Sequence, residues 1–72
     1  MSRIVAIGEE ALLAGYALAG VELIAADGPD RAREAWDQLG DDVGLVLLAP
    51  AARRALSEML HRPGLLWVVL PA

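Results

Sequence analysis

The side chains that could act as nucleophile or base are few in this 72-residue chain. It has two serines, Ser2 and Ser57, one histidine, His61, and no cysteine or lysine. A nucleophilic serine needs a base within hydrogen-bond reach and usually a third group that orients the base. Ser57 precedes His61 by four residues on the expected outer face of a helix. We interpret this pair as solvated surface and predict no catalytic residue.

Two pairs of neighbouring carboxylates, Glu9-Glu10 and Asp41-Asp42, are of the type that holds Mg²⁺ or serves as acid and base. The glutamates follow the first expected strand, where a phosphate site would need a glycine-rich turn, and their charge would repel a nucleotide. The aspartates precede the third expected strand, at the end of the sheet opposite the usual functional edge. We interpret both pairs as helix-start and loop charges and predict neither a cofactor nor a metal site.

Four short apolar runs alternate with three helical patterns. The expected strands are residues 3–7, 21–26, 43–49 and 65–70, and the expected helices are 9–19, 29–39 and 50–62. A three-helix bundle is the competing interpretation, but breakers bound the third and fourth runs at strand length. The alternation predicts one α/β domain over residues 1–72, with a four-stranded parallel sheet and three helices. We expect a receiver-like and Rossmann-like three-layer fold, in which the strand order is 2-1-3-4.

The third strand of this pattern ends at Ala49-Pro50. A receiver domain carries its phosphorylated aspartate there, so phosphotransfer is not expected. In the second helix, Ala32, Ala35, Trp36 and Leu39 form an apolar stripe, which predicts that Trp36 is a core residue, and Arg33 and Asp37 can pair on the exposed face. Glu22 in the second strand predicts an edge position in the sheet.

The composition favours a partner. Hydrophobic residues make up 57% of the chain, above the roughly 45–50% of ordinary soluble domains. A domain this small usually needs a disulfide, a metal or a partner for stability, and without cysteine and with one histidine only the partner remains. The net charge of −4 argues against nucleic acid. The apolar runs are far shorter than the ~20 residues of a membrane-spanning helix, so we expect a cytosolic protein without direct membrane insertion.

One segment is more specific than its composition. Residues 15–21, GYALAGV, closely resemble the G-F-x-L-A-G-V segment of the F subunit of the V/A-type ATP synthases, and residues 43–48 and 65–71 resemble that family's third and fourth strands. The resemblance implies a non-catalytic subunit of the central stalk (the rotor), peripheral to the membrane. Together with the D subunit it would couple ATP synthesis or hydrolysis to ion transport. The expected interaction residues are Leu12, Gly15, Tyr16, Leu18, Ala19, Gly20 and Trp67.

Two departures from the family limit what the resemblance implies. The family usually has an aspartate-rich turn after its first strand, where this chain has Gly8-Glu9-Glu10, and it usually continues past the fourth strand into a helical extension. No contact of that extension is carried over.

Two other functions stay open, a stand-alone receiver-like interaction or regulatory domain and a small-ligand binder or enzyme. The arginines Arg53, Arg54 and Arg62 suit either an acidic partner or a solvated face.

The expected strand order leaves part of the sheet uncovered. Right-handed crossovers in the order 2-1-3-4 place the first helix on one face and the second and third helices on the other. The residues of the third and fourth strands that project to either face are nevertheless apolar, as in strands that are covered on both sides. We therefore expect an open apolar patch, bordered by Leu12, Tyr16 and Ala19, that meets a partner or a second copy of the chain.

Overall fold

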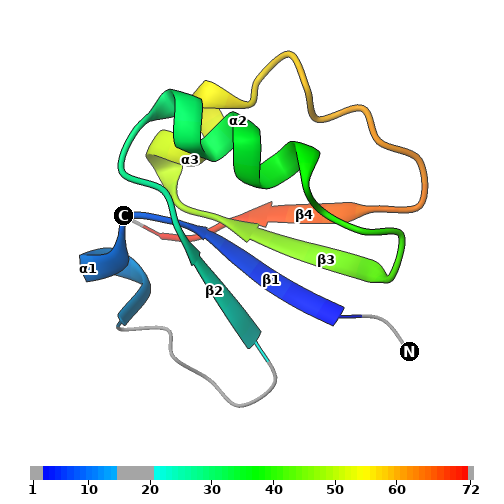
Figure 1. Cartoon of the computed structure of the whole chain (residues 1–72), viewed down its shortest axis with the longest axis horizontal. Coiled ribbons are helices and arrows are strands. Elements are labelled where there is room, and N and C mark those ends of the chain that lie inside the picture. The colour runs from blue at the N-terminus through cyan, green and yellow to red at the C-terminus, as the bar shows by residue number, and fades with distance from the viewer. Residues whose placement is uncertain (1–2, 15–20, 72) are drawn as a thin grey trace.

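A computed structural model describes residues 3–14 and 21–71 (Figure 1). Its strands are β1 (Arg3–Gly8), β2 (Val21–Ala25), β3 (Val43–Leu48) and β4 (Leu66–Val69), and its helices are α1 (Glu10–Leu13), α2 (Pro29–Asp37) and α3 (Pro50–Ala55). All strand pairs are parallel and the order is β2-β1-β3-β4. The predicted three-layer α/β fold and its strand order are confirmed.

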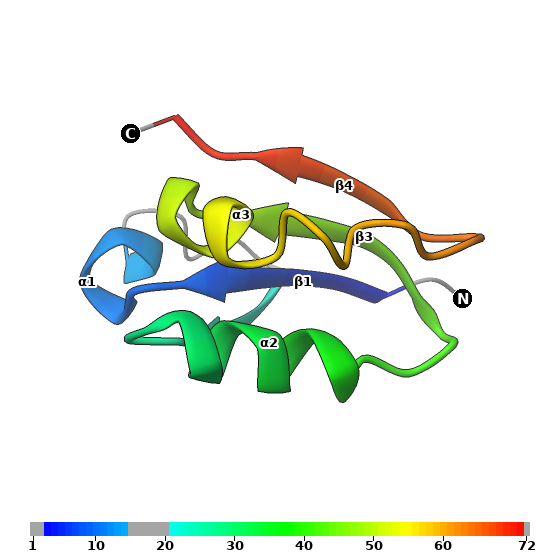
Figure 2. The same ribbon diagram turned by 90° about the horizontal axis from the view of Figure 1, so that it is seen from above.

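The helices divide between the two faces of the sheet as the crossover rule requires. Helices α2 and α3 lie together on one face, and α1 lies near the carboxyl end of β1 and β2 (Figures 1 and 2). Strand β1 occupies the interior of the sheet, and its residues Val5, Ala6 and Ile7 are fully buried. Glu22 lies on the edge strand β2, which confirms the edge position that its charge predicts.

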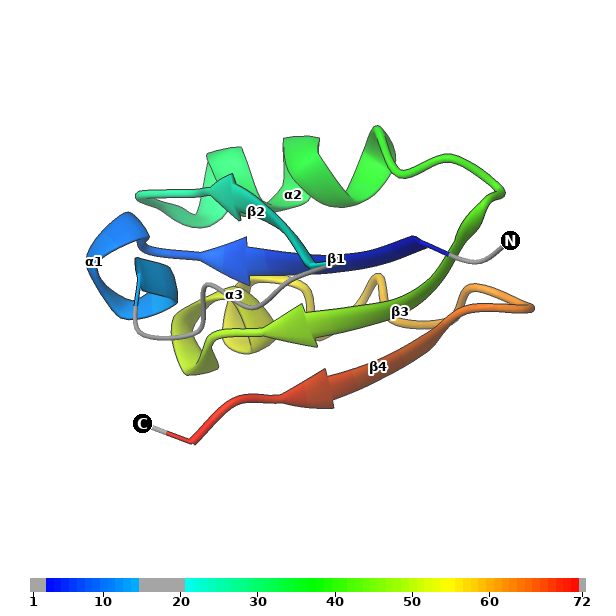
Figure 3. The same ribbon diagram turned by 90° about the horizontal axis from the view of Figure 1, so that it is seen from below.

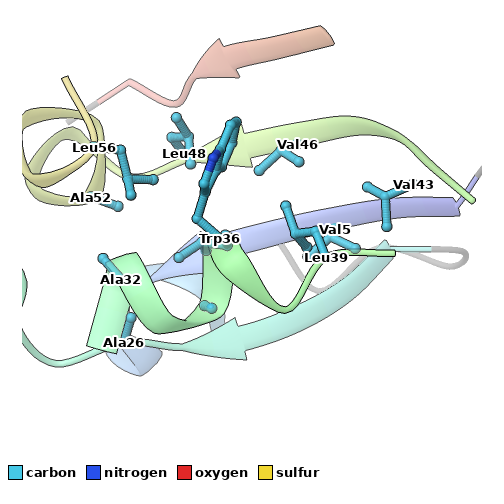
Figure 4. Packing of buried hydrophobic residues seen from close by; sticks show 12 residues of the cluster. Val5, Ala26, Ala32, Trp36, Leu39, Val43, Val46, Leu48, Ala52 and Leu56 are labelled. Carbon is cyan, nitrogen blue, oxygen red and sulfur yellow. The ribbon is translucent and has the colours of Figure 1, made fainter. Parts of the chain in front are cut away.

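Helix α2 begins at Pro29, whose fixed φ suits the first turn, and it buries Ala32, Ala35 and Trp36. Trp36 is 3% exposed and lies in the larger core cluster, between α2 and the sheet (Figure 4), so the prediction that it is a core residue is confirmed. The predicted pairing of Arg33 with Asp37 is wrong. The Arg33 guanidinium instead contacts Asp30 in the first turn at 2.8 Å. Asp30, three residues before Arg33, and Asp37, four residues after it, are both within reach on the helix surface, so spacing alone did not decide between them.

Helix α3 is shorter than the expected range 50–62. It ends at Ala55, and turns follow, one of them closed by the Met59 amide donating to the Leu56 carbonyl at 2.8 Å. This departure has a packing reason. Leu56 is fully buried, and the turns let the Arg62 guanidinium donate to the carbonyls of Trp36 and Leu39 at the end of α2. Tertiary contacts therefore replace two turns of helix.

The first helix also differs from its expected range 9–19. Residues Glu10–Leu13 form α1, and residues 15–20 lie outside the part of the chain that the structure describes. Leu13 is the α1 residue that packs on the sheet, where it joins Ala6 and Leu70 in a second, smaller core cluster. This arrangement places Leu13, rather than Leu12, on the sheet side of α1.

Candidate interaction surface

The two faces of the sheet are distinguished by the strand register. In parallel neighbours, paired residues project to the same face, and successive residues of one strand project to opposite faces. Val46 pairs with Trp67 and packs under α2 and α3, whereas Leu45 pairs with Leu66 and Leu47 pairs with Val68. Leu66 and Val68 therefore project from the face that carries α1.

We call the exposed and half-buried isoleucine, leucine and valine side chains on the α1 side of the sheet the open face. Among the described residues, it consists of Ile4, Val21, Leu23, Leu45, Leu47, Leu66 and Val68. Leu66 is 72% exposed, Val68 47% and Leu23 41%, while Leu45 and Ile4 are half-buried. Figure 3 shows β3 and β4 from this side with α1 displaced toward the carboxyl ends of the strands. Within the described part of the chain, the expected open patch is therefore present over β3 and β4.

Of the predicted interaction residues, the structure describes Leu12 and Trp67, and neither belongs to the open face. Leu12 is half-buried and lines a hollow with Pro50 and Arg54, between α1 and the start of α3. Trp67 projects to the opposite face, packs against the larger core and lies under Arg53, whose guanidinium carbon is 5.2 Å from the ring centroid. The remaining members of the predicted set, Gly15, Tyr16, Leu18, Ala19 and Gly20, lie outside the described residues.

Three exposed residues of the open face were not singled out from the sequence. They are Leu23, Leu66 and Val68. The signal for Leu66 and Val68 was present in the strand pattern, since β4 is apolar at consecutive positions although it lies at an edge. The family resemblance favoured residues of the first helix instead, because the specific motif lies there.

The carboxyl ends of the strands, where doubly wound folds usually bind ligands, are closely packed. A Cβ at Gly8 would collide with the Cβ of Ala49, so β1 and the start of α3 approach more closely than any side chain at position 8 allows. The small pocket at this end has a volume of about 80 Å³ and is lined by Glu9, Asp27 and Gly28 among others. In the described ranges, no three metal-ligating side chains gather at one place.

The amino-terminal end of the sheet carries a two-armed ion pair. The Arg3 guanidinium contacts Glu22 on β2 at 2.5 Å and Asp42, just before β3, at 3.0 Å. Hydrogen bonds from Arg3 lower the pKa of the Glu22 carboxyl and of the Asp42 carboxyl below their ordinary values, and the same bonds raise the pKa of Arg3. Asp42, half of the acidic pair considered above, therefore joins strands across the sheet. All three groups are solvent-exposed, so the contribution to stability is small.

Comparison with known families, curated proteins and solved structures gives no relative. No family model matches the chain, and neither a curated protein nor a solved structure is significantly similar to it. None of the helices in residues 3–14 and 21–71 is long and apolar enough to cross a membrane.

Proposed function

We propose that this protein is a non-catalytic interaction subunit that binds its partner through the open face of the sheet. The observation that carries the proposal is the exposure of large apolar side chains from β3 and β4, above all Leu66 at 72%. Contiguous apolar surface of this kind usually marks an interface, because its exposure to water is unfavourable by about 25 cal/mol per Å². Burial of this surface under a partner would supply the stabilisation that so small a domain needs.

The partner that we propose is the D subunit in the central stalk of a V/A-type rotary ATP synthase, the complex that couples ATP turnover to ion transport. The support is the resemblance of residues 15–21, 43–48 and 65–71 to the F subunit of that complex, together with the α/β fold. A long helical partner also suits the surface. An amphipathic helix can lay its apolar side along the twisted surface of an uncovered sheet.

A stand-alone receiver-like interaction domain is the second candidate. The strand order favours it, because β2-β1-β3-β4 is also the order of the first four strands of receiver domains. Ala49 and Pro50 occupy the position after β3 where such domains carry their phosphorylated aspartate. In that case the open face would bind a signalling partner, and no ATP synthase component would be recovered with the protein.

Co-expression with the D subunit encoded in the same genome tests the proposal. We expect the wild-type protein to co-purify with the D subunit and the Leu66→Glu variant to lose this binding at least tenfold, because the new carboxylate would be desolvated in the interface. Val69→Glu is the matched control, since Val69 lies on the same strand, is 43% exposed and projects to the other face. This control should bind the D subunit normally.

Circular dichroism would verify that both variants fold. Normal binding by folded Leu66→Glu would refute the open face as the interface. Failure of the wild-type protein to bind the D subunit, with other proteins recovered through the same face, would refute the rotor assignment and leave the interaction function standing.

A further inference from the structure

The outer edge of β4 presents main-chain groups that no neighbouring strand in the described structure uses. Strand β4 is the last in the sheet, and Figures 2 and 3 show no described helix or strand beyond it. The Leu70 amide donates to the Leu48 carbonyl at 2.8 Å. Because main-chain groups alternate sides along a strand, Leu66 and Val68 also bond toward β3. The amides and carbonyls of Trp67 and Val69 therefore point outward.

This outward row of donors is short and symmetric. On one side it ends at Leu65, whose amide already donates to the Arg62 carbonyl at 3.3 Å. On the other side the next outward position is Pro71, which has no amide hydrogen. Two residues remain, Trp67 and Val69, each with an outward donor and an outward acceptor, and they flank Val68. The edge is thus self-complementary about Val68.

Strand β4 also lacks the features that normally protect a sheet edge. Natural proteins place charges on exposed edge strands to prevent pairing with another chain. The opposite edge strand, β2, carries Glu22, held by Arg3. All four residues of β4 are uncharged and apolar, although the chain as a whole has a net charge of −4. Two copies that meet at β4 therefore bring uncharged strands together, so no like charges on the paired strands repel each other.

We propose that β4 pairs with β4 of a second copy of this chain, antiparallel, about a two-fold axis through Val68. Trp67 of each copy then exchanges two hydrogen bonds with Val69 of the other copy, and the two Val68 residues oppose each other as a non-hydrogen-bonded pair. The axis is perpendicular to the sheet, so the pairing is closed. It yields one eight-stranded sheet with all α2 and α3 helices on one side. Both open faces stay uncovered, so this pairing does not depend on the function proposed above.

A single cysteine tests the register, because the natural chain has none. In the proposed pair, the two Val68 Cα atoms lie about 4.5 Å apart, within the range that a disulfide spans. The two Leu66 Cα atoms lie about 14 Å apart, because they are separated by about four residues along the strands, and they cannot be joined. Under mild oxidation, Val68→Cys should form a disulfide-linked dimer at least ten times faster than Leu66→Cys. Random collision predicts the reverse, since Leu66 is the more exposed residue.

A second variant separates strand pairing from contact of apolar side chains. Val69→Pro removes one outward amide, a change that edge strands tolerate, and in the Val68→Cys background it should reduce cross-linking at least tenfold while the circular dichroism spectrum is retained. Sedimentation of the wild-type protein should show a concentration-dependent dimer.

Several results would overturn the pairing. They are equal cross-linking of the two cysteine variants, a wild-type protein that stays monomeric at all concentrations, and assemblies that grow beyond the dimer. Cross-linking of Val68→Cys to a different protein, with no dimer in the purified chain, would assign the edge to that protein and rule out the two-fold pairing.

Discussion

Replacement of Trp36 by alanine should bring the domain close to unfolding. Trp36 is 3% exposed and lies in the larger core cluster beside Val46, Leu48 and Leu56 (Figure 4). A tryptophan buries up to about 250 Å², which corresponds to roughly 6 kcal/mol at 25 cal/mol per Å². The denatured chain already buries part of this area, and alanine keeps the Cβ, so we expect a loss of about 3–5 kcal/mol. A 72-residue domain has a total stability of only about 4–11 kcal/mol.

Urea unfolding followed by far-ultraviolet circular dichroism measures this loss without relying on the fluorophore that the substitution removes. Trp67→Ala is the control of matched chemistry. Trp67 is half-buried at the edge of the same cluster, so its truncation should cost about half as much or less. A loss below about 1 kcal/mol for Trp36→Ala, or a larger loss for Trp67→Ala, would contradict the placement of the core between α2 and the central strands.

Four further outcomes are expected. Gly8→Ala should destabilise the domain by about 1–3 kcal/mol in urea melts, because its Cβ would collide with that of Ala49. Arg62→Met should cost about 2 kcal/mol by the same assay, because two carbonyls at the end of α2 lose a charged donor. The ion pairs of Arg3 lower the pKa of the Glu22 and Asp42 carboxyls, so their contribution to folding stability is present at neutral pH and is lost as the pH falls through the lowered pKa values. In urea melts between about pH 7 and pH 3, the stability of Arg3→Met should therefore depend less on pH than that of the wild-type protein. Calorimetry should detect no binding of ATP or ADP, since Glu9 and Glu10 at the first strand–helix turn would repel phosphates, and none of Mg²⁺, since no three metal-ligating side chains gather among the described residues.

The strands and the parallel sheet were predictable from the sequence because local signals and global topology agree. The order 2-1-3-4 was expected because receiver-like folds share this alternation. Apolar runs of strand length end at Gly8, Asp27 and Pro50, and the helical patterns between them are long enough for crossovers. The uncovered part of the sheet followed from the expected strand order and the right-handedness of the crossovers. Here the physical rule acts on the whole chain, so small errors at single residues do not change the result.

The details that failed depend on choices between nearly equal energies. Arg33 reaches a carboxylate three residues before it or four residues after it, and helical spacing does not select one. Similarly, spacing did not fix which leucine of α1, Leu12 or Leu13, contacts the sheet. The early end of α3 is set by Arg62 and Leu56, whose partners lie far away in the sequence. The outward direction of the main-chain groups on β4 depends on strand register, which a single sequence does not show.

The parallel sheet also determines how this domain folds and opens. Every strand pair must close across a crossover, as Ile4 does with Val21 and with Leu45, so no hairpin exists among the described strands to start the process locally. Folding should therefore be slow for a chain of this length. In the monomer, the edge strands β2 and β4 are each bonded to one neighbouring strand, so they should open before β1 and β3. In hydrogen exchange at concentrations where the protein is monomeric, the Leu70 amide, bonded to Leu48, should exchange well before the Ala49 amide, bonded to Ile7 in the middle of the sheet.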